Sequence, residues 1–308
     1  MPTRKRRPRK KPGISIIGAG RLGLALAISL RARGYPLEAL VTRSTASARR
    51  TAALFDAHPP VLAAKQLDQL PPSEIVIVAT PDDQLPEVSK SLARIPAFKG
   101  RTPTVLHTSG ALASTVLSPL AKLGWHTGSL HPLLSVSDSK AAVKALPGAF
   151  WCVEGDSVAV QQARTIVRDL KGYSFSIASE KKPLYHAAAV MASGNVVAQF
   201  DVAVEMLSCS GLSRKQAQQV LLPLLESTVR NLSRSETSEA LTGTFARGDL
   251  GTVLRHLKAL SGKPFAEARE LYLLLGRRSL TLAETNGLDP RSSKSIRRAL
   301  RKGNAAKR

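Results

Sequence analysis

The first half of the chain alternates short apolar runs with amphipathic stretches. The near-continuous β-branched run at Glu74–Ala79 is typical of a strand buried on both faces of a parallel sheet. Helical spacing follows the first run as far as Gly34 and recurs over Val158–Leu170. The runs predicted to be strands of one sheet are Gly13–Ile17, Leu37–Thr42, Glu74–Ala79, Thr104–Thr108, Ala149–Val153 and Tyr173–Ile177. This alternation predicts an α/β fold, a doubly wound Rossmann sheet.

After about Ser179 the strand-like runs disappear and long helical patterns take over, separated by Gly, Ser and Pro. The helices predicted there are Pro183–Leu207, Ser213–Leu232, Glu236–Ala246, Leu250–Leu260 and Pro264–Thr285. We therefore expect a Rossmann-like α/β domain over 13–178 and an all-helical C-terminal domain over 179–290.

Composition narrows the class of protein. The chain has 308 residues, of which 43% are hydrophobic, which excludes a wholly disordered protein. No uninterrupted apolar run approaches the roughly 18 residues of a membrane span, so no membrane association is expected. Cys152 and Cys209 stand alone, without the spacing of a disulfide framework or a metal site. They fit a reducing, cytoplasmic location.

The net charge of +23 is concentrated at the two ends of the chain. Residues 1–13 contain seven basic residues and residues 291–308 contain eight, with no acidic residue in either segment, which leaves +8 for residues 14–290. Runs of like charge repel themselves, so disordered tails are expected over 1–12 and 291–308. They are interpreted as solvated tails or as weak, salt-dependent binders of polyanions.

A glycine-rich segment links the first strand to the first helix. It reads Gly18, Ala19, Gly20, Arg21, Leu22 and Gly23. Between a strand and a helix this pattern is typical of dinucleotide binding, because the first glycine forms the turn and the second admits the pyrophosphate. The third lets helix and strand pack closely, and the helix N-terminus then faces the phosphates.

The end of the second strand indicates which coenzyme binds. NAD sites place an acidic residue about 20 residues after the glycines, but this chain has Thr42, Arg43 and Ser44 there. A guanidinium favours a 2′-phosphate, so NADP is expected, unless Arg43 is an ordinary exposed loop arginine. Ala79 and Thr80, after the third predicted strand, are expected to contact the cofactor. Asp82, close behind them, is either a helix cap or a cofactor contact.

Several segments together resemble one known group. They are Gly18–Gly23, His107–Ala111, Ser129–Leu133, Tyr185–Val190, Leu241–Gly243 and Arg247–Asp249. The chain resembles, over roughly 13–285, bacterial proteins that join a Rossmann-like NADP oxidoreductase domain to a helical domain of unknown function. These belong to the 6-phosphogluconate dehydrogenase-like superfamily, with β-hydroxyacid dehydrogenases and pyrroline-5-carboxylate reductase as relatives.

The resemblance implies a homodimer and a site built around Ser109 and Gly110, which match the Ser-Gly segment that holds the substrate carboxylate in β-hydroxyacid dehydrogenases. Those enzymes also use a helix lysine followed four residues later by asparagine. No Lys-x-x-x-Asn occurs in Pro183–Leu207, although Lys182 directly precedes it.

Hydride transfer to a C=O or C=N bond requires a proton donor, and histidine suits this task. His186 is the first candidate because Lys182, His186 and Ser193 share a helical face. The catalytic candidates are therefore His186, Ser109, His107, His131 and Ser193, each with an alternative structural role; His107, for example, could orient the Ser109 turn. Arg247 and Asp249 are candidates for an anion clamp, a cap or a subunit contact.

The sequence thus predicts an NADP-dependent oxidoreductase that binds a small carbonyl, hydroxy-acid or imine substrate between its two domains. One alternative is a non-catalytic NADP-binding sensor or regulator. Another is a nucleic-acid-associated protein recruited through the basic tails.

Overall fold

The computed structural model describes residues 10–55 and 59–305, and these form two compact units, Met1–Ala192 and Ser193–Arg308. The division after Ala192 differs from the predicted boundary after Ala178. The reason is that Lys182, beyond the predicted boundary, is completely buried in the first unit. Each unit is described by itself below.

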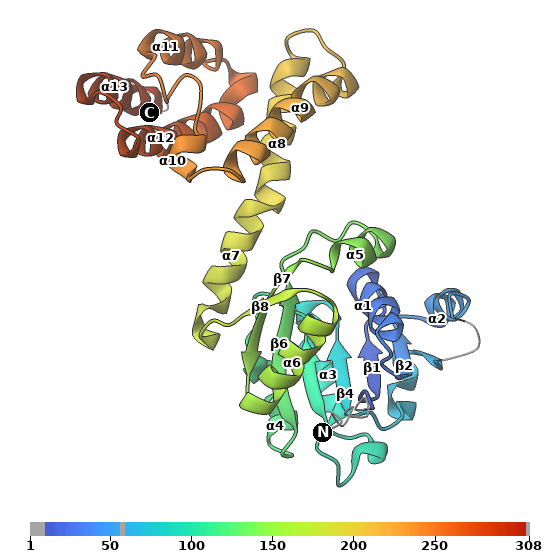
Figure 1. The fold of residues 1–308 in the computed structure, drawn as a ribbon. Coiled ribbons are helices and arrows are strands. Elements are labelled where there is room, and N and C mark those ends of the chain that lie inside the picture. The colour runs from blue at the N-terminus through green and yellow to red at the C-terminus, as the bar shows by residue number, and fades with distance from the viewer. Residues whose placement is uncertain (1–9, 56–58, 306–308) are drawn as a thin grey trace, which may run out of the picture. The chain divides into compact units, whose positions relative to one another are not determined.

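The first unit is built on an eight-stranded sheet with strand order β3-β2-β1-β4-β5-β6-β7-β8 (Figure 1). Its strands are β1 (Ile14–Ile17), β2 (Leu37–Thr42), β3 (Val61–Ala63), β4 (Ile75–Val78), β5 (Thr104–His107), β6 (His126–Pro132), β7 (Phe150–Gly155) and β8 (Tyr173–Phe175). All neighbours pair in parallel except β6 and β7, which are antiparallel. The predicted doubly wound sheet is confirmed, because the order reverses beside β1.

Helices cover both faces of this sheet. They are α1 (Arg21–Ala32), α2 (Thr45–Ala52), α3 (Leu85–Leu92), α4 (Ser118–Ala121), α5 (Ser139–Ala145) and α6 (Ser157–Asp169). The last helix of the first unit is α7 (Lys182–Ala192), in which Lys182 is the buried residue. One apolar core contains buried residues of α1, α5 and α6, and a second contains buried residues of α3 and α4. Two cores on opposite faces leave the carboxyl edge of the parallel strands open for a ligand.

Two strands were not predicted. β3 has only three residues, and β6 reads His-Thr-Gly-Ser-Leu-His-Pro, which lacks a β-branched run. Gly128 in β6 is nevertheless required, because a Cβ there would lie 2.9 Å from the Glu154 carbonyl oxygen. β6 forms a strand because neighbouring strands enclose it. Its amino-acid composition alone does not indicate a strand.

The second unit is helical, as predicted. Its helices are α8 (Gly194–Ser208), α9 (Arg214–Leu232), α10 (Thr237–Ala240), α11 (Leu250–Ala259), α12 (Ala266–Thr285) and α13 (Pro290–Ala305). The long helix predicted over 183–207 is interrupted at Ser193, whose φ and ψ of −128° and −82° are not helical. The helix predicted over 236–246 is limited to α10, and Gly243 has a left-handed φ of +84°.

The disorder predicted for residues 291–308 is wrong as far as Ala305, where the structure has α13. Two apolar residues at helical spacing, Ile296 and Leu300, lie among the cations of this segment. Both are completely buried against α11 and α12. The other predicted tail covers residues 1–12, and its residues up to Arg9 lie outside the described part of the chain. Lys11 is ion-paired with Asp169 on α6.

Candidate active site

The glycine turn has the steric properties that a dinucleotide requires. Gly18 has a φ of +93°, and a Cβ there would lie 2.6 Å from the Ala79 carbonyl oxygen. A Cβ on Gly23 would lie 2.2 Å from the Gly18 carbonyl oxygen, so helix and strand are in close contact. At Gly20 the nearest atom to a Cβ would be 4.0 Å away. The backbone at Gly20 is therefore open to the approach of a phosphate.

A cavity of about 360 Å³ lies at this turn, at the carboxyl ends of β1, β2 and β4. Its lining residues include Gly18, Ala19, Gly20, Thr42, Arg43, Ser47, Ala79 and Thr80. The Thr80 hydroxyl is buried there without a hydrogen-bond partner among the described residues. A buried hydroxyl costs free energy unless it is paired, so it is suited to a polar group of a ligand. The open glycine backbone and this hydroxyl together fit a nicotinamide dinucleotide.

The end of the cavity near β2 carries an exposed guanidinium and no carboxylate. Ser44 caps α2 by accepting a hydrogen bond from the Ser47 amide at 3.2 Å, and the Thr42 hydroxyl donates to the Ser44 carbonyl oxygen at 3.1 Å. Arg50 donates to the Ser47 hydroxyl at 3.2 Å. The hydroxyls of Thr42 and Ser44 thus organise the loop, while Arg43 is available to a ligand.

The other predicted cofactor residues have supporting positions. Arg21 is exposed and donates to the Val136 carbonyl oxygen at 3.4 Å. Leu22 packs against an apolar core and Gly23 is buried. None of these three residues lines the cavity.

A second group of polar side chains surrounds the ammonium group of Lys182, at the start of α7. Lys182 is completely buried. Its Nζ donates to the Ser109 carbonyl oxygen at 2.9 Å and to the Ser129 hydroxyl at 2.7 Å. An ammonium group has three N–H donors, so one is left without an acceptor in the described chain. Burial lowers the pKa of Lys182, against the opposing effect of the Glu154 carboxylate.

Ser109 connects this lysine to the dinucleotide cavity. Its hydroxyl donates to the Asp82 carboxylate at 2.8 Å and accepts hydrogen bonds from the Ala111 and Leu112 amides. Asp82 follows Thr80, which lines the cavity, by two residues. His107 accepts the Ser109 amide on its Nδ1 at 3.2 Å, so it orients the Ser109 turn.

Two histidines and a tyrosine form a group beside Gly110. His131 shares a hydrogen bond of 2.7 Å between its Nδ1 and the Tyr185 hydroxyl, and its ring centroid is 5.8 Å from that of His186. A Cβ on Gly110 would lie 2.4 Å from His186 and 2.8 Å from His131. The glycine therefore allows both imidazoles to contact the backbone beside Lys182.

The buried histidines are held neutral near pH 7. Burial and the positive charge of Lys182 lower the pKa of His107 to about 3, although a hydrogen bond to the Ala113 backbone opposes this shift. Burial, Lys182 and His186 lower the pKa of His131 to about 4. His107 and His131 thus act as neutral hydrogen-bonding groups near pH 7.

The structure brings together His107, Ser109, His131 and His186 in the first unit. Ser193 is exposed and belongs to the second unit, where it precedes α8. Asp249 caps α11 by accepting the Thr252 amide at 2.9 Å, so the cap is the role that the structure gives it.

The catalytic candidates predicted from the sequence do not include Lys182, Ser129, Tyr185 or Glu154. For Lys182 the signal is the one given above, because it precedes His186 by four residues and therefore shares its helical face. Glu154 is buried and accepts hydrogen bonds from Ser114 and Ser179. No local pattern marks Glu154, because its partners come from distant segments.

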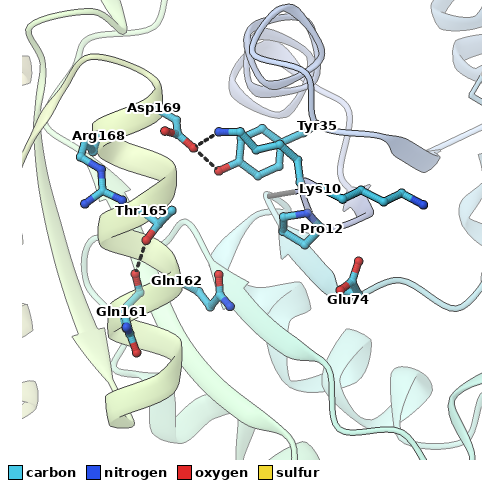
Figure 2. Close-up of a pocket in the computed structure, with 10 residues that line it drawn as sticks. Lys10, Pro12, Tyr35, Glu74, Gln161, Gln162, Thr165, Arg168 and Asp169 are labelled. Carbon is cyan, nitrogen blue, oxygen red and sulfur yellow. Dashed lines mark hydrogen bonds and ion pairs between the residues drawn. The ribbon is translucent and has the colours of Figure 1, made fainter. Parts of the chain in front are cut away.

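A separate cavity of about 460 Å³ adjoins the segment before β1 (Figure 2). Figure 2 shows that Tyr35 points toward Asp169, and the Tyr35 hydroxyl donates to Asp169 at 2.6 Å. Lys11 is paired with the same carboxylate. Tyr35 and Lys11 thus share the Asp169 carboxylate as their partner. These contacts attach the segment before β1 to α6.

Among the described residues, no group of three histidine, cysteine or acidic side chains is placed to hold a metal ion.

Comparison with known protein families supports a two-part organisation. Residues 3–132 match a Rossmann-like domain model, and residues 149–279 match a domain of unknown function, DUF2520. No curated protein matches the sequence.

The chain matches solved structures with the same fold, and each match covers nearly the whole chain of the solved structure. A protein from Bacteroides fragilis, provisionally assigned as an NADP oxidoreductase, has 23% identity and a TM-score of 0.69, and the match covers 88% of this chain and 99% of that one. A Thermotoga maritima protein has 23% identity and a TM-score of 0.70, with 89% and 99% covered. Pyrroline-5-carboxylate reductase from Streptococcus pyogenes has 15% identity and a TM-score of 0.56, with 96% and 100% covered. At these identities the likeness shows the fold.

Proposed function

We propose that this chain, a Rossmann-like domain joined to a DUF2520 domain, is an NADP(H)-dependent oxidoreductase acting on a small carbonyl, hydroxy-acid or imine substrate. One observation carries the proposal. Thr80 lines the glycine-cradled cavity, and Asp82, two residues later, is hydrogen-bonded to Ser109, whose carbonyl oxygen accepts a hydrogen bond from Lys182. A dinucleotide in this cavity would thus have its reactive end beside a buried cation.

The bound coenzyme would supply or accept a hydride. Lys182 would hold a proton at Nζ and pass it to the substrate oxygen or nitrogen through the N–H that has no protein acceptor. Because burial lowers its pKa, Lys182 is a better acid than an exposed lysine. Ser109 and Ser129 fix the position of Nζ. His186 and the His131–Tyr185 pair would hydrogen-bond the rest of the substrate.

The coenzyme assignment is tested by Arg43→Ala. We expect NADPH to bind 5- to 150-fold more weakly, about 1–3 kcal/mol, because a charged hydrogen bond to the 2′-phosphate is lost. NADH lacks this phosphate, so its affinity should change less than twofold. Calorimetric titration of both coenzymes gives the two ratios. Arg33→Ala removes another exposed arginine and serves as the control. Equal weakening of NADPH and NADH by Arg43→Ala would contradict NADP specificity.

We also propose that the protein is a homodimer formed through α8 and α9. These helices of 15 and 19 residues bury only Val204 and Ala217, respectively. Their exposed apolar residues are Val197, Val220, Leu222, Leu224, Val229 and Leu232. Within the described residues, one helical stretch, Ser179–Ser208, is long and apolar enough to span a membrane. Length and apolar composition are weak support for insertion into a membrane, because a helix that pairs with another protein copy can have the same length and composition.

The dimer is tested by Leu224→Glu, which places a charge on the exposed apolar face of α9. Sedimentation equilibrium should give twice the chain mass of 32.9 kDa for the wild type and the monomer mass for the variant at micromolar concentration. Leu123→Glu, at an exposed apolar position of the first unit, is the control and should remain dimeric. A monomeric wild type would refute the dimer.

The two unpaired thiols, Cys152 and Cys209, support the cytoplasmic location predicted from the sequence.

A further inference from the structure

Helix α13 presents a row of cations on one face. Its exposed cations are Arg291, Lys294, Arg298, Arg301 and Lys302, at steps of three or four residues with one adjacent pair. Arg297, by contrast, is ion-paired with Glu284 on α12. For the five exposed cations, no ion pair with a described carboxylate is present. We call these five residues the α13 stripe.

The opposite face of α13 is occupied by the protein's own core. Ile296 and Leu300 are completely buried and pack with residues of α11 and α12, including Val253 and Leu280. An amphipathic helix that enters a lipid surface needs its apolar face free. α13 could enter a bilayer only by breaking this core, so its free face can take part only in ionic and hydrogen-bonding contacts. These properties favour a hydrophilic polyanion over a membrane.

We propose that the α13 stripe binds the phosphodiester backbone of a nucleic acid, without reading its sequence. From Arg291 to Lys302 the stripe extends over about 16 Å of helix. A nucleic-acid strand carries a phosphate about every 3.4 Å along its axis, so four or five phosphates lie within that length. The five cations of the stripe match this number. α13 lies outside both matched domain models, so this surface is an addition to the oxidoreductase core.

The proposal is tested by Lys294→Gln/Arg298→Gln/Arg301→Gln in the full chain. The probes are a fluorescent 20-base-pair DNA duplex and a single-stranded RNA of 20 nucleotides, followed by anisotropy between 50 and 200 mM salt. Each lost phosphate contact removes about 0.9 from the slope of log affinity against log salt on duplex DNA, so the slope should fall by about 2.7. We expect about 10- to 100-fold weaker binding at 100 mM salt.

The matched control is Lys99→Gln/Arg101→Gln/Lys122→Gln, which removes the same charge from exposed positions of the first unit. It should change the affinity less than threefold. Both variants alter only exposed side chains, and unchanged thermal unfolding verifies that they fold.

Three results would overturn the proposal. The first is a wild type that binds neither probe, and the second is equal weakening by both variants, which would mean diffuse attraction to the whole charge. The third is tighter binding to phosphatidylserine vesicles than to either nucleic acid, lost in the stripe variant. Comparison of the two probes shows whether duplex DNA or single-stranded RNA is bound more tightly.

Discussion

Replacing Lys182 by methionine is expected to lower the rate of NADPH oxidation 100- to 10,000-fold, the usual contribution of a general acid. Methionine has a similar length and fills the buried space, but it provides no proton and no charge. The affinity for NADPH should change less than threefold, because Lys182 does not line the dinucleotide cavity. The measurement is NADPH absorbance with a panel of small aldehydes, ketones, keto acids and cyclic imines, beside calorimetric titration of the coenzyme.

Two further variants test whether the loss of turnover is specific to Lys182. Lys181→Met removes a neighbouring exposed lysine and should leave turnover unchanged. His186→Gln should reduce turnover less than Lys182→Met, because His186 is assigned to substrate binding. If Lys182→Met keeps wild-type turnover and His186→Gln abolishes it, the acid is His186 and our assignment is wrong. If the wild type binds NADPH but oxidises it with no compound in the panel, the sensor alternative gains support.

The dinucleotide cavity could be predicted from the sequence because its determinants are local. Gly18, Gly20 and Gly23 lie within six residues, and together with the apolar run before them and the helical pattern after them they indicate a strand, a turn and a helix. Arg43 follows β2 directly, so its place at the carboxyl edge of the sheet follows from the parallel topology. These predictions required no knowledge of distant contacts.

The Lys182 cluster could not be predicted in the same way. Its members come from loops, strands and helix α7, between Asp82 and His186 in the sequence. Only the pairing of β5, β6 and β7 brings Ser109, Ser129 and Glu154 together. A lysine is exposed in most proteins, so its burial is a property of the assembled fold. For α13, the density of positive charge concealed a helical period of apolar residues that the structure makes clear.

Mild acid is expected to destabilise the protein through the buried histidines. The pKa of His107 is lowered to about 3 and that of His131 to about 4, whereas both would titrate near 6.5 in the unfolded chain. Below pH 6.5 the unfolded chain therefore binds more protons than the folded one, and the free energy of unfolding falls as the pH decreases. Above about pH 7 these two histidines are neutral in both states and contribute no pH dependence.

The expected loss is about 2 kcal/mol for each histidine between pH 7.5 and pH 5, from the linkage relation. Urea unfolding at constant ionic strength, at pH 7.5, 6.5, 5.5 and 5.0, measures it, and this range ends above the pH at which carboxylates dominate. His107→Asn keeps a hydrogen-bond acceptor for the Ser109 amide and should remove about half of the pH dependence, whatever its effect on stability at pH 7.5. His256→Asn, at an exposed histidine, should leave the dependence intact. A wild type equally stable at pH 7.5 and 5.0 would show that His107 and His131 are not buried as neutral groups, and the site as described would then be wrong.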